Sequence, residues 1–130
     1  MKHLAIFIGD AIEKILKGEK IIEGRFTIDK IPPYLVVSKG DIIFLKQSGE
    51  KIIGQAEVEN VLFYEGLTGE SIGKLRKEYS KEMCVSDKFW QEKVNSKYAS
   101  IIFLTNPTRF LAPIKNKKKD RRSWVLLGNG

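Results

Sequence analysis

The sequence predicts an α+β fold: a small β-barrel or strongly curved sheet of about five to six strands, with a helical insertion and a short N-terminal helix. Two patterns predict this class. Apolar residues alternate with polar ones in several segments, whereas residues 68–83 show helical spacing and lie between predicted strands. At 130 residues the chain is long enough for one hydrophobic core but not for two, so we expect residues 1–130 to form a single domain.

The first elements are a strand and a short helix. Residues 3–8 are mostly apolar and are predicted to form the first strand. Asp10 precedes Glu13 by three residues, which is the spacing of a capping box, and apolar residues follow at helical intervals. Gly18 is placed to end the helix. The prediction is a short amphipathic helix over residues 10–17, held mainly by packing.

From Lys20 onward the apolar period changes from helical to two. Alternation places Glu23 and Arg25 side by side on one surface of the strand that follows. Gly24 lies between them and indicates a bulge or a close backbone approach. Lys20 is out of phase with both charged residues in a perfect strand. It lies at the strand entry, however, so alternation does not determine the direction of its side chain.

The remaining elements follow from alternation, turn residues and helical spacing. Before the helical insertion the sequence predicts an extended segment, a strand, a hairpin loop and a long strand, over residues 34–37, 42–46, 47–50 and 52–63. Helices are predicted over residues 68–83 and 86–94. A strand over 98–104, a turn at Asn106-Pro107, an edge strand over 110–114 and a closing strand over 123–127 complete the chain.

The chain carries a net charge of +7 at pH 7, which attracts polyanions through steering and counterion release. No basic amphipathic helix is long enough to lie on a bilayer, so nucleic acid is favoured over a membrane. One run concentrates the charge, and a run of this kind is often only a solvated loop. Here the overall charge and the following Trp124 favour contact with the nucleic-acid backbone. Its basic residues are Lys115, Lys117, Lys118, Lys119, Arg121 and Arg122.

The segment Gly18-x-Lys20-x-x-Glu23-x-Arg25 resembles the G-x-K-x-x-E-x-R signature of the ASCH domain, a member of the PUA-like superfamily. Those domains are small β-barrels generally linked to RNA. The resemblance implies that Lys20, Glu23 and Arg25 line a cleft between barrel and helices and bind RNA or a nucleotide-like ligand. Arg25 would hold a phosphate or a base edge, Lys20 would supply a mobile positive charge, and Glu23 would accept from a base amino group or orient the two cations.

An enzymatic alternative comes from the same resemblance. Some ASCH proteins are similar to small amidohydrolases that act on acylated cytidine with a lysine, a threonine and a glutamate. Lys20 matches the lysine, but Glu23 stands where the threonine would be, and Thr27 is too far along the strand to replace it. A Lys20–Glu23 pair would still be able to activate water, in an amidohydrolase or a ribonuclease. Whether the chain is an enzyme is left open, and binding without catalysis is favoured.

Aromatic residues offer a further way to hold bases. Trp90 and Tyr98, each close to polar residues in the sequence, are the candidates for base stacking, although most aromatic residues of a small domain belong to the core. A third hypothesis makes the chain a protein-interaction module of a translation or transcription complex, with its basic run facing an acidic partner.

Several site classes are excluded by composition. His3 and Cys84 are the only histidine and cysteine, so no zinc site can be assembled from them, and we expect no metal and no cofactor. Neither a Gly-rich phosphate loop nor a dinucleotide fingerprint occurs. No stretch approaches the ~20 apolar residues of a membrane span. A single cysteine and the absence of a signal-peptide pattern favour a cytoplasmic location.

Overall fold

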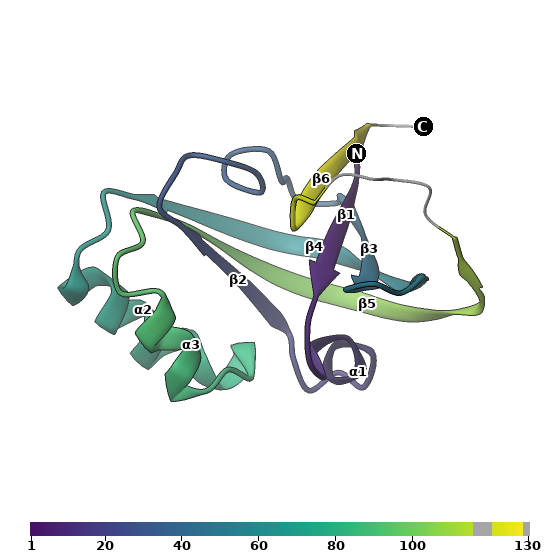
Figure 1. Cartoon of the computed structure of the whole chain (residues 1–130), viewed down its shortest axis with the longest axis horizontal. Coiled ribbons are helices and arrows are strands. Elements are labelled where there is room, and N and C mark those ends of the chain that lie inside the picture. Colours follow the sequence, from purple (N-terminus) through teal and green to yellow (C-terminus); the bar gives the residue numbers. More distant parts are fainter. Residues whose placement is uncertain (116–120, 129–130) are drawn as a thin grey trace.

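A computed structural model of the chain describes residues 1–115 and 121–128. In these residues six strands form one sheet and three helices pack against it (Figure 1). The elements in chain order are β1 (Lys2–Phe7), α1 (Ala11–Leu16), β2 (Ile22–Thr27), β3 (Ile42–Gln47), β4 (Ile52–Glu65), α2 (Gly69–Met83), α3 (Asp87–Glu92), β5 (Tyr98–Ile114) and β6 (Trp124–Gly128). The predicted α+β class is confirmed.

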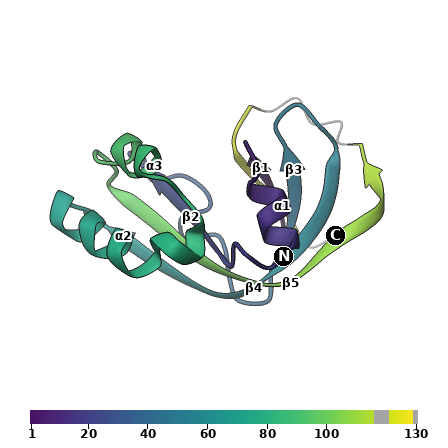
Figure 2. The ribbon, with the colours of Figure 1, turned by 90° about the horizontal axis from the view of Figure 1, so that it is seen from below.

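The strand order in the sheet is β2-β5-β4-β3-β1-β6. The pair β1–β3 is parallel and the other pairs are antiparallel. The sheet curls into a half-barrel around α1, while α2 and α3 lie together against its other half (Figure 2). Because β2 and β6 are the two edges, the curl leaves the barrel open between β2 and the β1–β6 pair.

Two hydrophobic clusters reflect this division. The first lies inside the curl and includes Ile12 and Ile15 of α1, Leu45 of β3 and Trp124 of β6. The second lies between the sheet and the helices α2 and α3, and includes Phe26, Leu75, Met83 and Trp90. The strand β2 contributes to the second cluster and forms one border of the opening.

The long strand β5 corrects one prediction. The sequence predicts a turn at Asn106-Pro107 between two shorter strands, yet residues 98–114 form one strand that pairs with β4. The local irregularity is absorbed as a bulge: the register shifts between Gln55 and Glu57, which pair with Thr108 and Thr105. A bulge accommodates both a proline, which lacks an N–H, and an asparagine with positive φ without ending the strand.

The structure of segment 34–37 corrects a second prediction. It is predicted to be extended but forms turns, because the amide of Tyr34 bonds to the Ile31 carbonyl and that of Val36 to the Pro33 carbonyl. Leu35 at its centre has a φ of 62°, which an extended segment does not adopt.

At the start of α1, the predicted capping box is also absent. Asp10 is the N-cap residue, but its side chain makes no capping hydrogen bond. Its carboxylate instead lies 3.3 Å from the Lys14 ammonium, one turn along the helix. The helix is held by the buried side chains of Ile12 and Ile15, as the prediction of packing requires.

Gly24 confirms the predicted close approach. A Cβ at this position would lie 2.3 Å from Cε of Met83, so the helix α2 packs directly on the backbone of β2. Ile22, Gly24 and Phe26 face the helices, which turns Glu23 and Arg25 to the opposite face, as alternation predicts. No helix in the described ranges is long and apolar enough to cross a membrane.

Candidate polar site at the open edge of the half-barrel

Lys20 lies in the turn between α1 and β2. Gly18, with a φ of 79°, ends the helix, and the amide of Lys20 bonds back to the Lys14 carbonyl. The side chain is only 4% exposed, and its ammonium lies 3.1 Å from Oε1 of Glu23. Lys20 therefore points to the same side as Glu23, which alternation alone left open, because the turn precedes the regular part of the strand.

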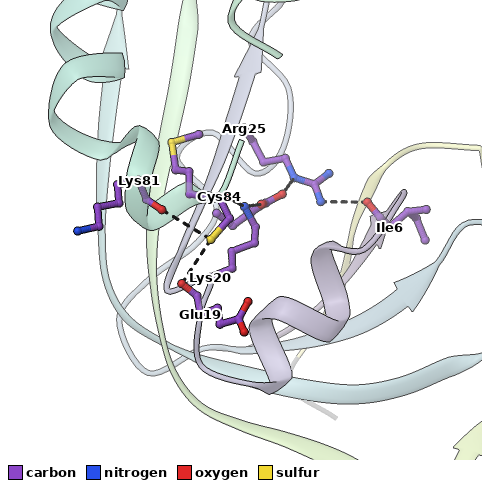
Figure 3. A network of polar contacts seen from close by, with 8 residues as sticks. Ile6, Glu19, Lys20, Arg25, Lys81 and Cys84 are labelled. Carbon is purple, nitrogen blue, oxygen red and sulfur yellow. Dashed lines mark hydrogen bonds and ion pairs between the residues drawn. The ribbon is translucent and has the colours of Figure 1, made fainter. Parts of the chain in front are cut away.

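The C-terminal end of α2 provides the second partner of this ammonium. Lys20 donates to the backbone carbonyl of Met83, the last residue of α2. Carbonyls at a helix C-terminus carry partial negative charge and stabilise a cation there. Cys84 follows in the left-handed conformation, and its thiol sulfur lies 3.4 and 3.6 Å from the carbonyl oxygens of Glu19 and Lys81, which share its one S–H donor (Figure 3). These contacts join the end of α2 to the turn that holds Lys20.

Glu23 bridges the two cations. Its Oε1 accepts from Lys20, and its Oε2 accepts from Nε of Arg25 at 2.5 Å. Burial acts to raise the pKa of Glu23, but the charges of Arg25 and Lys20 outweigh it and hold this pKa below its ordinary value. The carboxylate is therefore ionised at neutral pH, and the three side chains together carry one net positive charge.

Arg25 spans the opening of the half-barrel. From β2 its Nη2 donates to the carbonyl of Ile6 in β1 at 3.0 Å, and its Nη1 to the carbonyl of Ser123, just before β6, at 3.4 Å. The guanidinium also lies over the rings of Phe7 and Trp124, 5.0 and 5.2 Å from their centroids. Figure 3 shows the contact with Ile6, and the contact with Ser123 completes the link between the two edges of the sheet. The sequence gives no sign of this contact, since Ser123 lies 98 residues away from Arg25.

The buried side chains of His3 and Asp41 hold the Trp124 ring that lies beneath Arg25. The indole N–H of Trp124 donates to Nδ1 of His3 at 3.1 Å, and Nε2 of His3 lies 2.7 Å from a carboxylate oxygen of Asp41. Because an indole only donates, Nδ1 accepts, and the histidine proton lies on Nε2. Burial acts to raise the pKa of Asp41, but hydrogen bonds from His3, the Ser38 amide and the terminal amine hold it below its ordinary value. Sequence reasoning assigned no role to His3.

Ser100 is a further residue that sequence reasoning missed. It is paired with Arg25 in the β2–β5 register and is 1% exposed. Cross-strand partners place their side chains on the same face of a sheet. The hydroxyl therefore belongs to the surroundings of the Lys20–Glu23–Arg25 network, a position that becomes visible only once the strand pairing is known.

The two aromatic candidates lie outside this network. Trp90 is 2% exposed, packs against Phe26 and Phe89, and donates its indole N–H to Ser80. This core position argues against base stacking on Trp90. Tyr98 pairs with Thr27 at the far end of β2 and packs on Tyr34.

The basic run is described only at its ends. Lys115, Arg121 and Arg122 are exposed, whereas Lys117, Lys118 and Lys119 lie outside the described residues. Within the described residues, no three His, Cys, Asp or Glu side chains are grouped as metal ligands would be.

The chemistry of the network is that of a donor-rich site. Both carboxylate oxygens of Glu23 are engaged by cations, so the group offers little acceptor capacity. Lysine and arginine carry more N–H donors than the contacts above use. A ligand that presents anionic or carbonyl oxygens fits such an arrangement better than one that presents donors.

No family model matches the sequence, and no curated protein matches it. Solved structures do match. ASCH from Zymomonas mobilis has a TM-score of 0.75 at 14% identity, over 97% of this chain and 87% of that chain. A mutant of the same protein gives 0.71 at 17% identity, over 97% and 89%. The hypothetical protein PH0355 gives 0.51 at 21% identity, over 83% and 100%. At such identities the likeness shows the fold, and the ASCH resemblance suggested by the motif is confirmed at that level.

Proposed function

We propose that this chain, which has the fold of the ASCH proteins, is a PUA-like module that binds RNA or a nucleotide-like ligand at the Lys20–Glu23–Arg25 network. The observation that carries the proposal is the network itself: two nearly buried cations share one carboxylate at the open edge of the half-barrel. Buried charges are costly unless they are well paired, and a buried polar site is a frequent mark of function. The net charge of +7 is consistent with a polyanionic ligand.

Each residue has a distinct part in this proposal. Arg25, held by Glu23 on one side and by backbone carbonyls on the other, offers its remaining N–H groups in a fixed orientation to a phosphate or a base edge. Lys20, held between Met83 and Glu23, adds a point charge. Glu23 orients both cations rather than contacting the ligand. The proposed site excludes Trp90 and Tyr98.

The basic run adds affinity in the same proposal. Lys115, Lys117, Lys118, Lys119, Arg121 and Arg122 would contact backbone phosphates, which increases affinity without base preference.

A second candidate is hydrolysis of an amide on an acylated nucleoside, or cleavage of RNA. The 3.1 Å contact between Lys20 and Glu23 favours it, because the two groups required to activate water are in contact. Against it, both oxygens of Glu23 already contact cations, whose charges lower the pKa of the carboxylate and make it a weaker base. The hydroxyl of Thr27 donates to the Asp29 carbonyl at the far end of β2 and does not replace a threonine nucleophile.

The test is RNA affinity by fluorescence anisotropy, measured for single-stranded and structured RNA. The wild type is compared with Arg25→Ala, and Arg76→Ala serves as the control. Arg76 lies on α2 and forms an exposed ion pair with Asp87, so the control removes the same charge away from the network. Loss of charge-assisted contacts, worth about 1.5–3 kcal/mol, should weaken binding by Arg25→Ala roughly 10- to 100-fold. The control should change it little.

Binding is compared at a temperature at which urea titration shows both variants to be folded. Equal affinities for the two variants would remove Arg25 from the site. A wild type that binds no RNA at low salt would refute the proposal. Turnover of N4-acylated cytidine or of an RNA oligonucleotide, lost in Lys20→Met, would establish the enzymatic candidate instead.

A further inference from the structure

A second basic site lies at the corner of the sheet where the β3–β4 hairpin meets the end of β5. A groove of about 490 Å³ opens there, lined by Lys46, Gly49, Glu50, Lys51, Ile53, Pro113 and Lys115. In Figure 1 the hairpin and the far end of β5 lie close together, well away from α2 and α3. None of the residues Lys46, Lys51 and Ile53 belongs to the motif or to the basic run.

The strand register brings the three lysines together. Lys46 is the last residue of β3 that pairs with β4, and it lies opposite Ile52. Ile52 in turn lies opposite Ile114 of β5, which places Lys51 and Lys115 next to each other just beyond this pair. One lysine of β3 and two lysines that lie just outside β4 and β5 therefore line a single corner of the sheet.

The charge of this corner is not neutralised within the described residues. Ion pairs occupy Lys14, Lys20 and Lys74 elsewhere in the chain, but within the described ranges no acidic side chain pairs with a groove lysine. Among the described residues that line the groove, Glu50 is the one acidic residue. The wall between the charges is apolar, being formed by Ile53 and Pro113. An open, apolar groove bordered by lysine point charges is suited to a phosphodiester chain.

We propose that this groove binds the backbone of single-stranded RNA and forms a second contact region for the RNA bound at the motif. The inference rests on the proposed function, which it extends to a separate part of the surface. Lysine contacts to phosphates supply affinity and not base choice, so the groove would lengthen the bound strand without restricting its sequence.

The two sites are joined through the end of β1. The carbonyl of Ile6 accepts from Arg25, and the carbonyl of the next residue, Phe7, accepts from the amide of Ser48 in the hairpin, at 2.9 Å. Gln47 also donates its side-chain amide to the carbonyl of Gly9. The hairpin that carries the groove is therefore fixed to the strand that Arg25 contacts, which gives the two sites a defined relative position.

The test is the salt dependence of RNA affinity for Lys46→Gln/Lys51→Gln/Lys115→Gln. The control, Lys74→Gln/Lys77→Gln/Lys88→Gln, removes the same charge from exposed positions on α2 and α3. Each phosphate contact to a single strand contributes about 0.7 to the slope of log affinity against log salt, so three lost contacts should lower it by about two. The control should leave the slope within about half a unit of the wild type.

A complementary variant tests the groove in the opposite direction. Glu50→Gln removes the negative charge from the groove and should tighten RNA binding a few-fold at low salt, whereas Glu70→Gln on α2 should not. An equal slope in the two lysine triples, with unchanged affinity in Glu50→Gln, would overturn the groove and leave the motif site intact. A wild type that binds no RNA would overturn both. If the substitution of Lys46, Lys51 and Lys115 lowered the salt slope for binding of an acidic peptide but not for binding of RNA, the groove would be assigned to a protein partner. That result would also overturn the proposal.

Discussion

Removal of the Glu23 carboxylate is the sharpest perturbation that the structure suggests. Glu23→Gln retains the size and one acceptor oxygen of the side chain but leaves Lys20 and Arg25 facing each other without the negative charge between them. The side chains of Lys20, Glu23 and Arg25 are 4%, 11% and 14% exposed, so solvent screens them only slightly. We expect the variant to fold but to be substantially less stable.

The magnitude follows from the behaviour of buried ion pairs. Removing one partner of such a pair costs roughly 3–5 kcal/mol because the remaining charge is uncompensated. Arg25 keeps its bonds to two carbonyls and Lys20 keeps its bond to Met83, which favours the lower end. A loss of about 3 kcal/mol in a domain of this size should lower Tm by on the order of 10 °C.

Urea unfolding followed by tryptophan fluorescence is a suitable assay, because both Trp90 and Trp124 are 2% exposed. The midpoint should fall while the m-value stays constant. Glu13→Gln is the matched control, since Glu13 pairs with Arg109 on the surface, where both side chains are about half exposed. A loss below about 1 kcal/mol in Glu23→Gln would show that the network is screened by water and would refute the reasoning.

The same pair of proteins should also reveal the titration of Glu23. Since its folded pKa lies below its ordinary value of 4.5, its contribution to stability is complete above pH 4.5 and is lost as the pH falls through the folded pKa. The stability gap between wild type and Glu23→Gln should therefore narrow below pH 4.5, by about 1.4 kcal/mol per pH unit at most. A gap that widens toward acid pH would contradict the assigned direction.

Two further substitutions test the packing around the site. Gly54→Ala should lower the free energy of unfolding in urea by about 1–3 kcal/mol, because its Cβ would lie 2.6 Å from the Thr108 backbone carbonyl. Gly24→Ala should lower it less, because the tip of the Met83 side chain can move away. A larger loss in Gly24→Ala than in Gly54→Ala would contradict this account. Arg25→Lys keeps the charge but loses the fork, so amide hydrogen exchange in β6 should accelerate. Unchanged protection of β6 would mean that Arg25 does not hold the opening.

Short strands were predicted well from the alternation of apolar and polar residues within them. Strands predicted over residues 42–46 and 123–127 are found at Ile42–Gln47 and Trp124–Gly128. The turn predicted at Asn106-Pro107 was wrong because pairing along β4 outweighs the local preference of these residues, and a bulge absorbs the misfit. Turn signals describe a dipeptide, whereas strand continuity is decided by a neighbour far away in the sequence.

The same difference between local patterns and distant contacts explains which features of the site could be predicted. Alternation sufficed to place Glu23 and Arg25 on one face, because that placement depends only on the strand that contains them. The direction of Lys20 and its contact with the Met83 carbonyl depend on where α2 ends. The contact of Arg25 with Ser123 depends on the curl that brings the last strand near β2. Neither contact can be predicted from the periodicity of the few residues around Lys20 or Arg25.

The geometry of Arg25 bears on how a ligand would reach it. Its Nε is taken by Glu23 and its Nη2 by the Ile6 carbonyl at 3.0 Å, whereas the contact of Nη1 with Ser123 is 3.4 Å long. A phosphate oxygen forms a shorter and stronger bond than a neutral carbonyl at that distance. Nη1 is therefore the donor most readily given to a ligand. Nη1 carries two N–H groups, so one of them can bind a ligand while the other keeps the contact with the Ser123 carbonyl just before β6.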